Sequence, residues 1–99
     1  MSYKKTMEGV KHLVQNEFDM ACKDNGERFH SAHEAYAVIK EEVEELETEV
    51  KLLQTVLGHM WWDVRYDDPY GDRLEELEKC AMQAACEAIQ VSAMARKAK

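Results

Sequence analysis

The sequence has few of the residues that interrupt helices, with one proline and four glycines among its 99 residues. A β-sandwich or another loop-rich fold needs many more turn residues, so both are disfavoured. The chain is also short of positive charge, because 13 lysines and arginines stand against 20 aspartates and glutamates, for a formal net charge of −7. A protein this acidic repels phosphate backbones, and we therefore expect it to bind neither DNA nor RNA.

The sequence contains neither a zinc-binding motif nor a membrane segment. The cysteines Cys22, Cys80 and Cys86 are odd in number and form no CxxC pair, which favours a reducing, cytoplasmic location. The N-terminus has no apolar run of the kind found in signal peptides, so we expect none. The least charged stretch, residues 80–94, is too short and too polar to span a bilayer, and we expect no membrane contact.

The abundant residues are strong helix formers, such as alanine, glutamate, lysine and leucine, and they predict a single all-α domain over residues 1–99. We predict helices from about Thr6 to Cys22, from Ala32 to about Val64, and from about Arg73 to Ala98. The turn between the last two is short, so they should form a long antiparallel hairpin. Because so short a chain buries little surface alone, we expect this hairpin and the N-terminal helix to assemble into an oligomeric helical bundle.

Apolar residues at alternating steps of three and four mark the predicted core faces of the two hairpin helices. The register of the first is Tyr36, Ile39, Val43, Leu46, Val50, Leu53, Leu57, Met60 and Val64. The register of the second is Leu74, Leu77, Ala81, Ala84, Ala88, Val91 and Ala95. A capping box precedes the first register, in which Ser31 accepts from the Glu34 amide and Glu34 reaches back to the Ser31 amide.

Four oxygen-bearing side chains are predicted to meet between the hairpin helices. Glu42 and Glu45 each precede a core position and lie about one turn apart on one edge of their helix. Glu87 and Gln90 stand in the same relation on the next helix, and antiparallel packing brings the two edges face to face. Glu87 is the sole charge in an alanine-rich stretch, where a carboxylate is costly to ionise unless a cation neutralises it. Mg²⁺ prefers such oxygens and leaves positions for water and phosphate.

Other interpretations of these acids remain open. Runs of glutamate on helices are usually solvated, and we expect this of Glu44, Glu47 and Glu49. For the converging acids, the rival to a metal site is structural ion pairing with nearby basic residues: Lys40, Arg96 or Lys97.

The same acids give the sequence a family resemblance. Residues 33–46, HEAYAVIKEEVEEL, resemble the first metal-binding helix of the MazG-like nucleotide pyrophosphohydrolases, and residues 87–95, EAIQVSAMA, resemble the second. The family pattern is EExxE followed, some distance on, by ExxD. The resemblance implies an all-α fold that forms homodimers or homotetramers. It also implies Mg²⁺-dependent cleavage of a nucleoside triphosphate to the monophosphate and pyrophosphate, with Mn²⁺ as a possible substitute.

Carried over by position, the resemblance makes Glu42, Glu45 and Glu87 metal ligands. Gln90 takes the fourth ligand position, where the family usually has aspartate, so one negative charge is missing from the pattern. Glu41 is expected to act beside Glu42 in catalysis, as a further ligand or as a hydrogen-bond partner of the attacking water. The gap between the two motifs is longer than in the family, which we expect to extend the hairpin outward.

Basic and aromatic residues complete the expected site. Lys40, Arg96 and Lys97 lie near helix ends or edges, where they could contact substrate phosphates or could simply be solvated cations. Trp62 belongs to an aromatic cluster late in its helix, which could stack on a base or could pack in a core or a subunit interface.

A second class of function fits the same sequence. The unbroken registers could make a helical hairpin that serves as a coiled-coil adaptor, with the acids present only for solubility. A non-catalytic descendant of the enzyme fold, marked by Gln90, lies between the two interpretations. The enzyme requires the acids of the two helices to meet at a shared pocket, whereas the adaptor does not.

Overall fold

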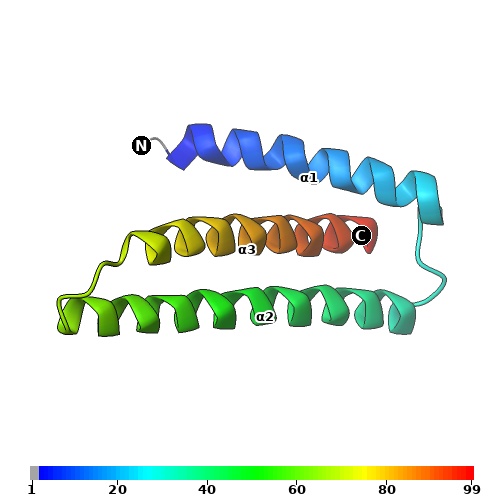
Figure 1. The fold of residues 1–99 in the computed structure, drawn as a ribbon. Coiled ribbons are helices and arrows are strands. Elements are labelled where there is room, and N and C mark those ends of the chain that lie inside the picture. Colours follow the sequence, from blue (N-terminus) through cyan, green and yellow to red (C-terminus); the bar gives the residue numbers. More distant parts are fainter. Residues whose placement is uncertain (1–2) are drawn as a thin grey trace.

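The computed structural model describes residues 3–99, and within them it contains three helices and no strand, as the all-α prediction expects (Figure 1). The helices are α1 (Tyr3–Asn25), α2 (Ala32–Arg65) and α3 (Gly71–Lys97). Each differs from its predicted bounds by at most three residues at either end. No helix of the described chain has a stretch both long enough and apolar enough to cross a membrane.

The second and third helices form the antiparallel hairpin that the short connection predicts (Figure 1). The turn of residues 66–70 reverses the chain, and Asp67 adopts a left-handed conformation within it, with φ of 55°. Arg73 fastens the start of α3 to the end of α2, because its Nε lies 3.1 Å from Oδ2 of Asp63.

The connection between α1 and α2 is set by local hydrogen bonds. Gly26 has φ of 85°, a value that glycine adopts without strain, and its amide donates to the Cys22 carbonyl at the end of α1. Oγ of Ser31 accepts from the Glu34 amide at 3.1 Å, as predicted for the helix cap. The return bond differs from the prediction, since Glu34 accepts from the amide of His30 and not from that of Ser31.

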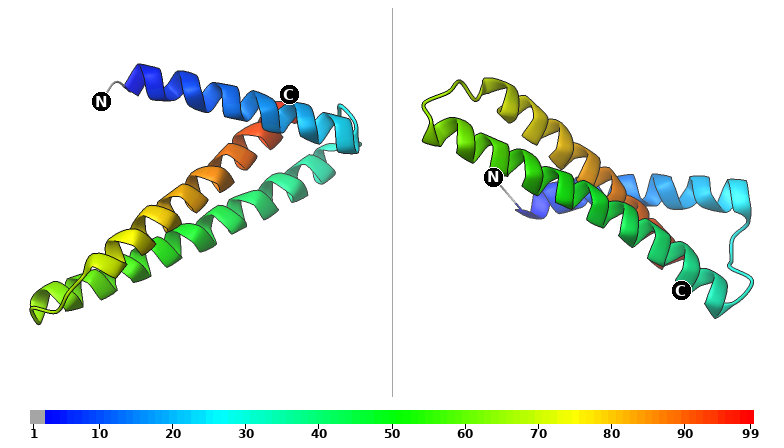
Figure 2. Two further views of the ribbon diagram at one scale, coloured as in Figure 1. Left: turned by 45° about the horizontal axis from the view of Figure 1, so that its top comes forward. Right: turned by 60° about the horizontal axis from the view of Figure 1, so that its bottom comes forward.

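The first helix lies across the C-terminal half of α3 and diverges from the hairpin toward its own N-terminus (Figure 2). At the crossing, the buried residues Val14, Ala93 and Met94 form a small core. Half-buried side chains pack around it: Phe18, Ala21, Phe29, Val38, Ile39 and Ile89. This crossing places residues of all three helices around one end of the hairpin.

The residues that the hairpin helices bury or half-bury follow the predicted registers only in part. The predicted positions that are half-buried are Ile39, Val43, Leu46, Leu53 and Met60 in α2 and Leu77, Ala84 and Val91 in α3. Other residues buried or half-buried in the two helices include Val38, Glu42, Glu49, Val56 and Asp63 in α2 and Arg73, Cys80, Glu87 and Met94 in α3. Several predicted core residues are instead exposed: Tyr36, Val50, Leu57, Val64, Leu74, Ala81, Ala88 and Ala95. The predicted core is wrong at these positions, because each helix has two adjacent apolar stripes and spacing alone does not tell which one meets the other helix.

Candidate metal centre

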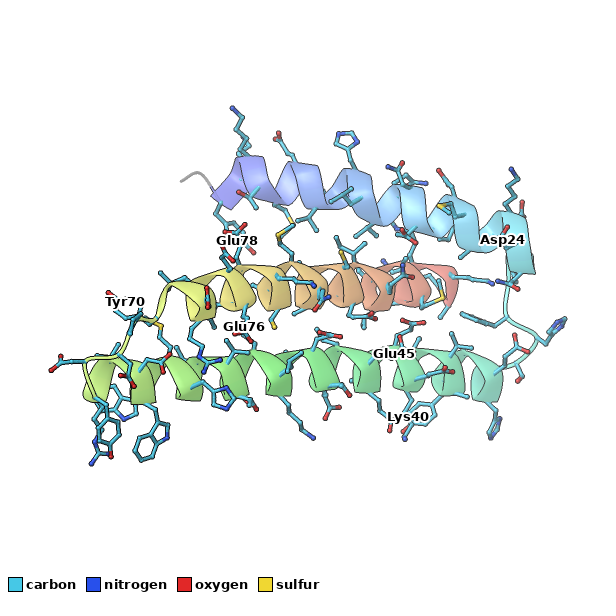
Figure 3. The ribbon with its side chains drawn as sticks, in the orientation of Figure 1. Asp24, Lys40, Glu45, Tyr70, Glu76 and Glu78 are labelled. Carbon is cyan, nitrogen blue, oxygen red and sulfur yellow. The ribbon has the colours of Figure 1, made fainter. Side chains whose placement is uncertain are left out.

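Three carboxylates from two helices meet in the middle of the hairpin. Glu42 and Glu45 extend from successive turns of α2, and Glu87 extends from α3 toward them. One carboxylate oxygen from each lies within 4.8 Å of the corresponding oxygens of the other two. Figure 3 shows Glu45 between the two helices. The packing of the two helices explains this convergence, because Glu42 and Glu87 are themselves half-buried.

These carboxylates are not neutralised by the described part of the protein. Within residues 3–99, no lysine, arginine or histidine forms an ion pair with any of the three. Oε2 of Glu87 is buried and has no hydrogen-bond partner there. A buried carboxylate oxygen without a donor is costly, which is the condition that a bound cation relieves.

The electrostatics of the cluster follow from this crowding. Burial raises the pKa of Glu42 above its ordinary value, and the charges of Glu45 and Glu87 raise it further. Burial also raises the pKa of Glu87, and the charges of Glu45 and Glu49 raise it further. Without a cation, the protein therefore holds protons at this site more tightly than isolated glutamates would.

Glu49 belongs to this electrostatic environment, although the sequence placed it on a solvated face. Its Oε2 is buried and unpartnered in the described chain, and its charge acts on Glu87. The expectation of solvation is wrong for this residue. A seven-residue spacing from Glu42 could have revealed it, because residues two helical turns apart lie on the same face.

The remaining motif residues lie beside the cluster. Gln90 is half-buried, and its Nε2 donates to Oε2 of Glu17 in α1 at 2.8 Å. In the family pattern this position is an aspartate. Here the side-chain nitrogen of Gln90 instead forms a hydrogen bond with a carboxylate of α1. Glu41 is exposed on α2, next to Glu42 in sequence, and its charge contributes to the raised pKa of Glu42.

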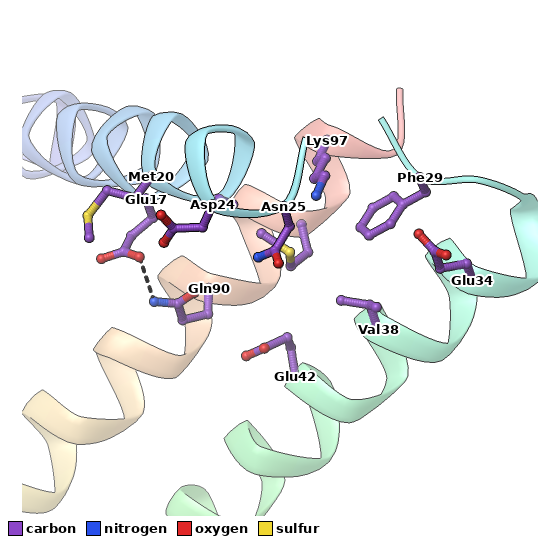
Figure 4. A pocket seen from close by; sticks show the side chains of 12 residues that line it. Glu17, Met20, Asp24, Asn25, Phe29, Glu34, Val38, Glu42, Gln90 and Lys97 are labelled. Carbon is purple, nitrogen blue, oxygen red and sulfur yellow. Dashed lines mark hydrogen bonds between the residues drawn. The ribbon is translucent and has the colours of Figure 1, made fainter. Parts of the chain in front are cut away.

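An open cleft of about 490 Å³ adjoins the carboxylates at the end of the hairpin where α1 crosses (Figure 4). Glu42 lines both this cleft and the cluster. Side chains from all three helices and the loop before α2 make up the rest of its wall: Glu17, Met20, Ala21, Asp24, Asn25, Phe29, Glu34, Val38, Gln90, Met94 and Lys97. Sequence reasoning missed the contribution of α1, because its spacing does not show where on the hairpin it packs.

Only one of the four predicted substrate-binding residues lies in this cleft. Lys97 is buried there, with its Nζ 4.7 Å from the centroid of the Phe29 ring. Arg96 lies outside it, where it donates to Oε1 of Gln15 at 2.7 Å. Lys40 points away from α3 and pairs with Glu44 at 3.1 Å on the exposed face (Figure 3).

Trp62 is also distant from the carboxylates. It lies some twenty residues after Glu42 on the same helix, which corresponds to about 30 Å. Its ring stacks on Tyr66 with a centroid separation of 5.4 Å, and the Arg65 guanidinium packs over it. Within one chain it therefore cannot contact a substrate bound at Glu42.

The donor set fits a hard divalent cation. Mg²⁺ and Mn²⁺ accept carboxylate oxygens, and Mg²⁺ commonly retains waters that a substrate phosphate can replace. Three carboxylates, one of them with a buried unpartnered oxygen, supply such ligands, and Glu42 among them also borders the open cleft.

Comparison of the chain with protein-family models, with curated proteins and with solved structures finds no match.

Proposed function

We propose that this protein is a Mg²⁺-dependent nucleotide pyrophosphohydrolase that cleaves a nucleoside triphosphate to the monophosphate and pyrophosphate. The observation that supports it most strongly is the convergence of Glu42, Glu45 and Glu87 without a neutralising cation in the described chain. The resemblance of both motifs to MazG-like enzymes points to the same chemistry. Mn²⁺ is an expected substitute for Mg²⁺, and a cytoplasmic location and a homodimeric or homotetrameric state are parts of the proposal.

The cation would be held by the three glutamates, and when bound it would neutralise phosphate charge and acidify a coordinated water. The neighbouring Glu41 and Glu42 would orient the water for in-line attack on the α-phosphorus. The bond between that phosphorus and the bridging oxygen then breaks, and pyrophosphate leaves with the oxygen. Such transfers depend mainly on positioning and charge stabilisation, which fixed carboxylates on two packed helices provide.

The cleft beside Glu42 is the proposed place for the nucleoside part of the substrate. Phe29 and Met94 offer it apolar contact, and Asn25 offers an amide that can both donate and accept. Lys97, already held over the Phe29 ring, is the basic side chain that lines the cleft, and it would contact a phosphate bound there. This assignment replaces the expectation that Lys40 and Arg96 contact phosphates.

The test is a screen of the eight common ribo- and deoxyribonucleoside triphosphates for pyrophosphate release, with Mg²⁺, with Mn²⁺ and with chelator. We expect at least one substrate to give pyrophosphate and monophosphate in equal amounts, with no release in chelator. Release of orthophosphate instead would contradict the bond assigned above. The absence of turnover with every nucleotide and both metals would contradict the enzymatic proposal.

A second candidate is a non-catalytic helical scaffold of the same fold. It is favoured by one specific observation, the hydrogen bond that commits Gln90 to Glu17 at the position where the family pattern has a metal-binding aspartate. A scaffold predicts that no nucleotide is turned over and that Glu87→Gln changes nothing beyond stability.

A further inference from the structure

The protein exposes more surface than a chain of its mass usually does. Its accessible surface is 7743 Å², whereas a folded monomer of 11.5 kDa is expected to expose about 5,800 Å². If each of two chains buried this surplus of about 1,900 Å² against the other, the total buried area would fall in the range of obligate homodimer interfaces. The area is therefore sufficient for a stable contact with a second copy of this chain.

Part of the exposed apolar surface lies in one line along α2, where Tyr36, Val50, Leu57 and Val64 are exposed and Val43 is half-buried. We call it the outer stripe, made of residues at a strict seven-residue spacing: Tyr36, Val43, Val50, Leu57 and Val64. Tyr36 is 68% exposed and Leu57 56% exposed, although both follow the apolar register of the helix. Half-buried apolar residues follow three positions after the first four members: Ile39, Leu46, Leu53 and Met60. The outer stripe and these half-buried residues together have the spacing of a coiled-coil seam. The half-buried residues lie on the side toward α3, and the outer stripe is left largely uncovered.

The charges that flank this seam favour an antiparallel partner. In a parallel pair, each residue of the outer face would lie level with its own copy, so Glu47 would meet Glu47 and Lys40 would meet Lys40. In an antiparallel pair with its two-fold axis beside Val50, Lys40 faces Trp61 of the second copy. Glu47 then faces Gln54, so neither Lys40 nor Glu47 meets a like charge. A two-fold symmetric contact of this kind uses the same surface on both copies, so it forms a closed dimer and does not extend into a longer assembly.

A groove lies at the position that this arrangement assigns to the partner's tryptophan. It has a volume of about 380 Å³ and is lined by Tyr36, Ile39, Lys40, Val43, Glu44 and Glu47. Trp61 is 58% exposed near the opposite end of the same helix. An indole seated over the Lys40 ammonium is a favourable cation–π contact.

We propose that the outer stripe of α2 is the contact between two antiparallel copies of this chain, with Trp61 of each copy seated in the Tyr36–Glu47 groove of the other. This proposal does not depend on the cation site, whose three glutamates all come from one chain. It also gives an interface role to the aromatic end of the hairpin, which lies far from the carboxylates.

The first test measures the mass of the intact protein by sedimentation velocity at micromolar concentration. We expect a dimer for the wild type and a monomer for Leu57→Glu. The charge would lower the association constant by at least about 100-fold, because each copy loses a buried leucine and gains a buried carboxylate. Leu52→Glu is the matched control, since Leu52 is 46% exposed on the same helix but lies off the outer stripe, and it should remain dimeric. A monomeric wild type, or equal dissociation by both variants, would overturn the proposal.

The second test keeps the stripe intact and reads the orientation. Copies with Glu47→Cys are mixed with copies with Gln54→Cys, oxidised, and analysed by peptide mass for the linked positions. The antiparallel pair predicts links between position 47 and position 54. Links between two copies of position 47 would indicate a parallel pair and overturn the arrangement.

Discussion

Replacing Glu87 with glutamine is expected to lower Mg²⁺-dependent pyrophosphate release by at least about 100-fold. The substitution removes one proposed ligand of the cation, and the cation would stabilise the charge that develops on the phosphate in the transition state by several kcal/mol. The amide is nearly the same size as the carboxylate, so the packing of α2 against α3 should persist. The helical content by circular dichroism should be unchanged. The measurement is the steady-state rate with the best nucleotide from the screen, over a range of Mg²⁺ concentrations.

The matched control for this variant is Glu78→Gln. Glu78 lies on the same helix and is exposed, and the substitution removes the same charge from the protein (Figure 3). Its rate should stay close to that of the wild type. Equal losses in the two variants would mean that net charge, and not cation binding at the cluster, supports the activity. An unchanged rate for Glu87→Gln would remove Glu87 from the site.

The metal-free protein is expected to lose stability as the pH rises through the range in which the cluster ionises. The carboxyl groups of Glu42 and Glu87 have pKa values raised above the ordinary 4.5. Between that value and the raised ones, the folded state binds more protons than the unfolded state, so the free energy of unfolding falls with rising pH. Saturating Mg²⁺ should restore it by mass action, because the cation binds the folded, ionised cluster.

Thermal unfolding with chelator, from pH 4.5 to 8, checks this expectation, and the Glu87→Gln variant isolates the cluster from other titrating groups. At pH 8 the variant should melt about 4 °C above the wild type, since two like-charge contacts of ~0.5 kcal/mol each are removed. The difference should shrink toward pH 4.5 and reverse when Mg²⁺ is added. A metal-free wild type that is more stable than the variant at pH 8 would show that the carboxylates are not repelling one another.

The sequence was sufficient to predict the helices because their signals are local. The cap at Ser31, the glycine at position 26 and the short turn before α3 each act within a few residues, and the structure contains all three. The antiparallel hairpin then follows from the length of the turn. The return bond of Glu34 shows the limit of such reasoning, because its two candidate amides are adjacent in sequence.

The face that each hairpin helix buries could not be predicted in the same way. Two apolar stripes run along α2 at nearly the same spacing, and the one that meets α3 is selected by packing between helices. This selection makes Glu49 part of the cluster environment and leaves Tyr36 and Leu57 exposed. The three converging glutamates were identifiable because each directly precedes a predicted core position. The cleft could not be predicted, because it depends on where α1 crosses α3.

Binding of a divalent cation by Glu42, Glu45 and Glu87 together can be measured by titrating the metal-free protein with Mn²⁺ and following the free ion by electron paramagnetic resonance. We expect saturable binding that Mg²⁺ displaces. Glu45→Gln should weaken this binding at least about 10-fold, and Glu78→Gln should leave it unchanged. Binding that is absent in the wild type, or equally strong in both variants, would contradict a cation site shared by the three glutamates.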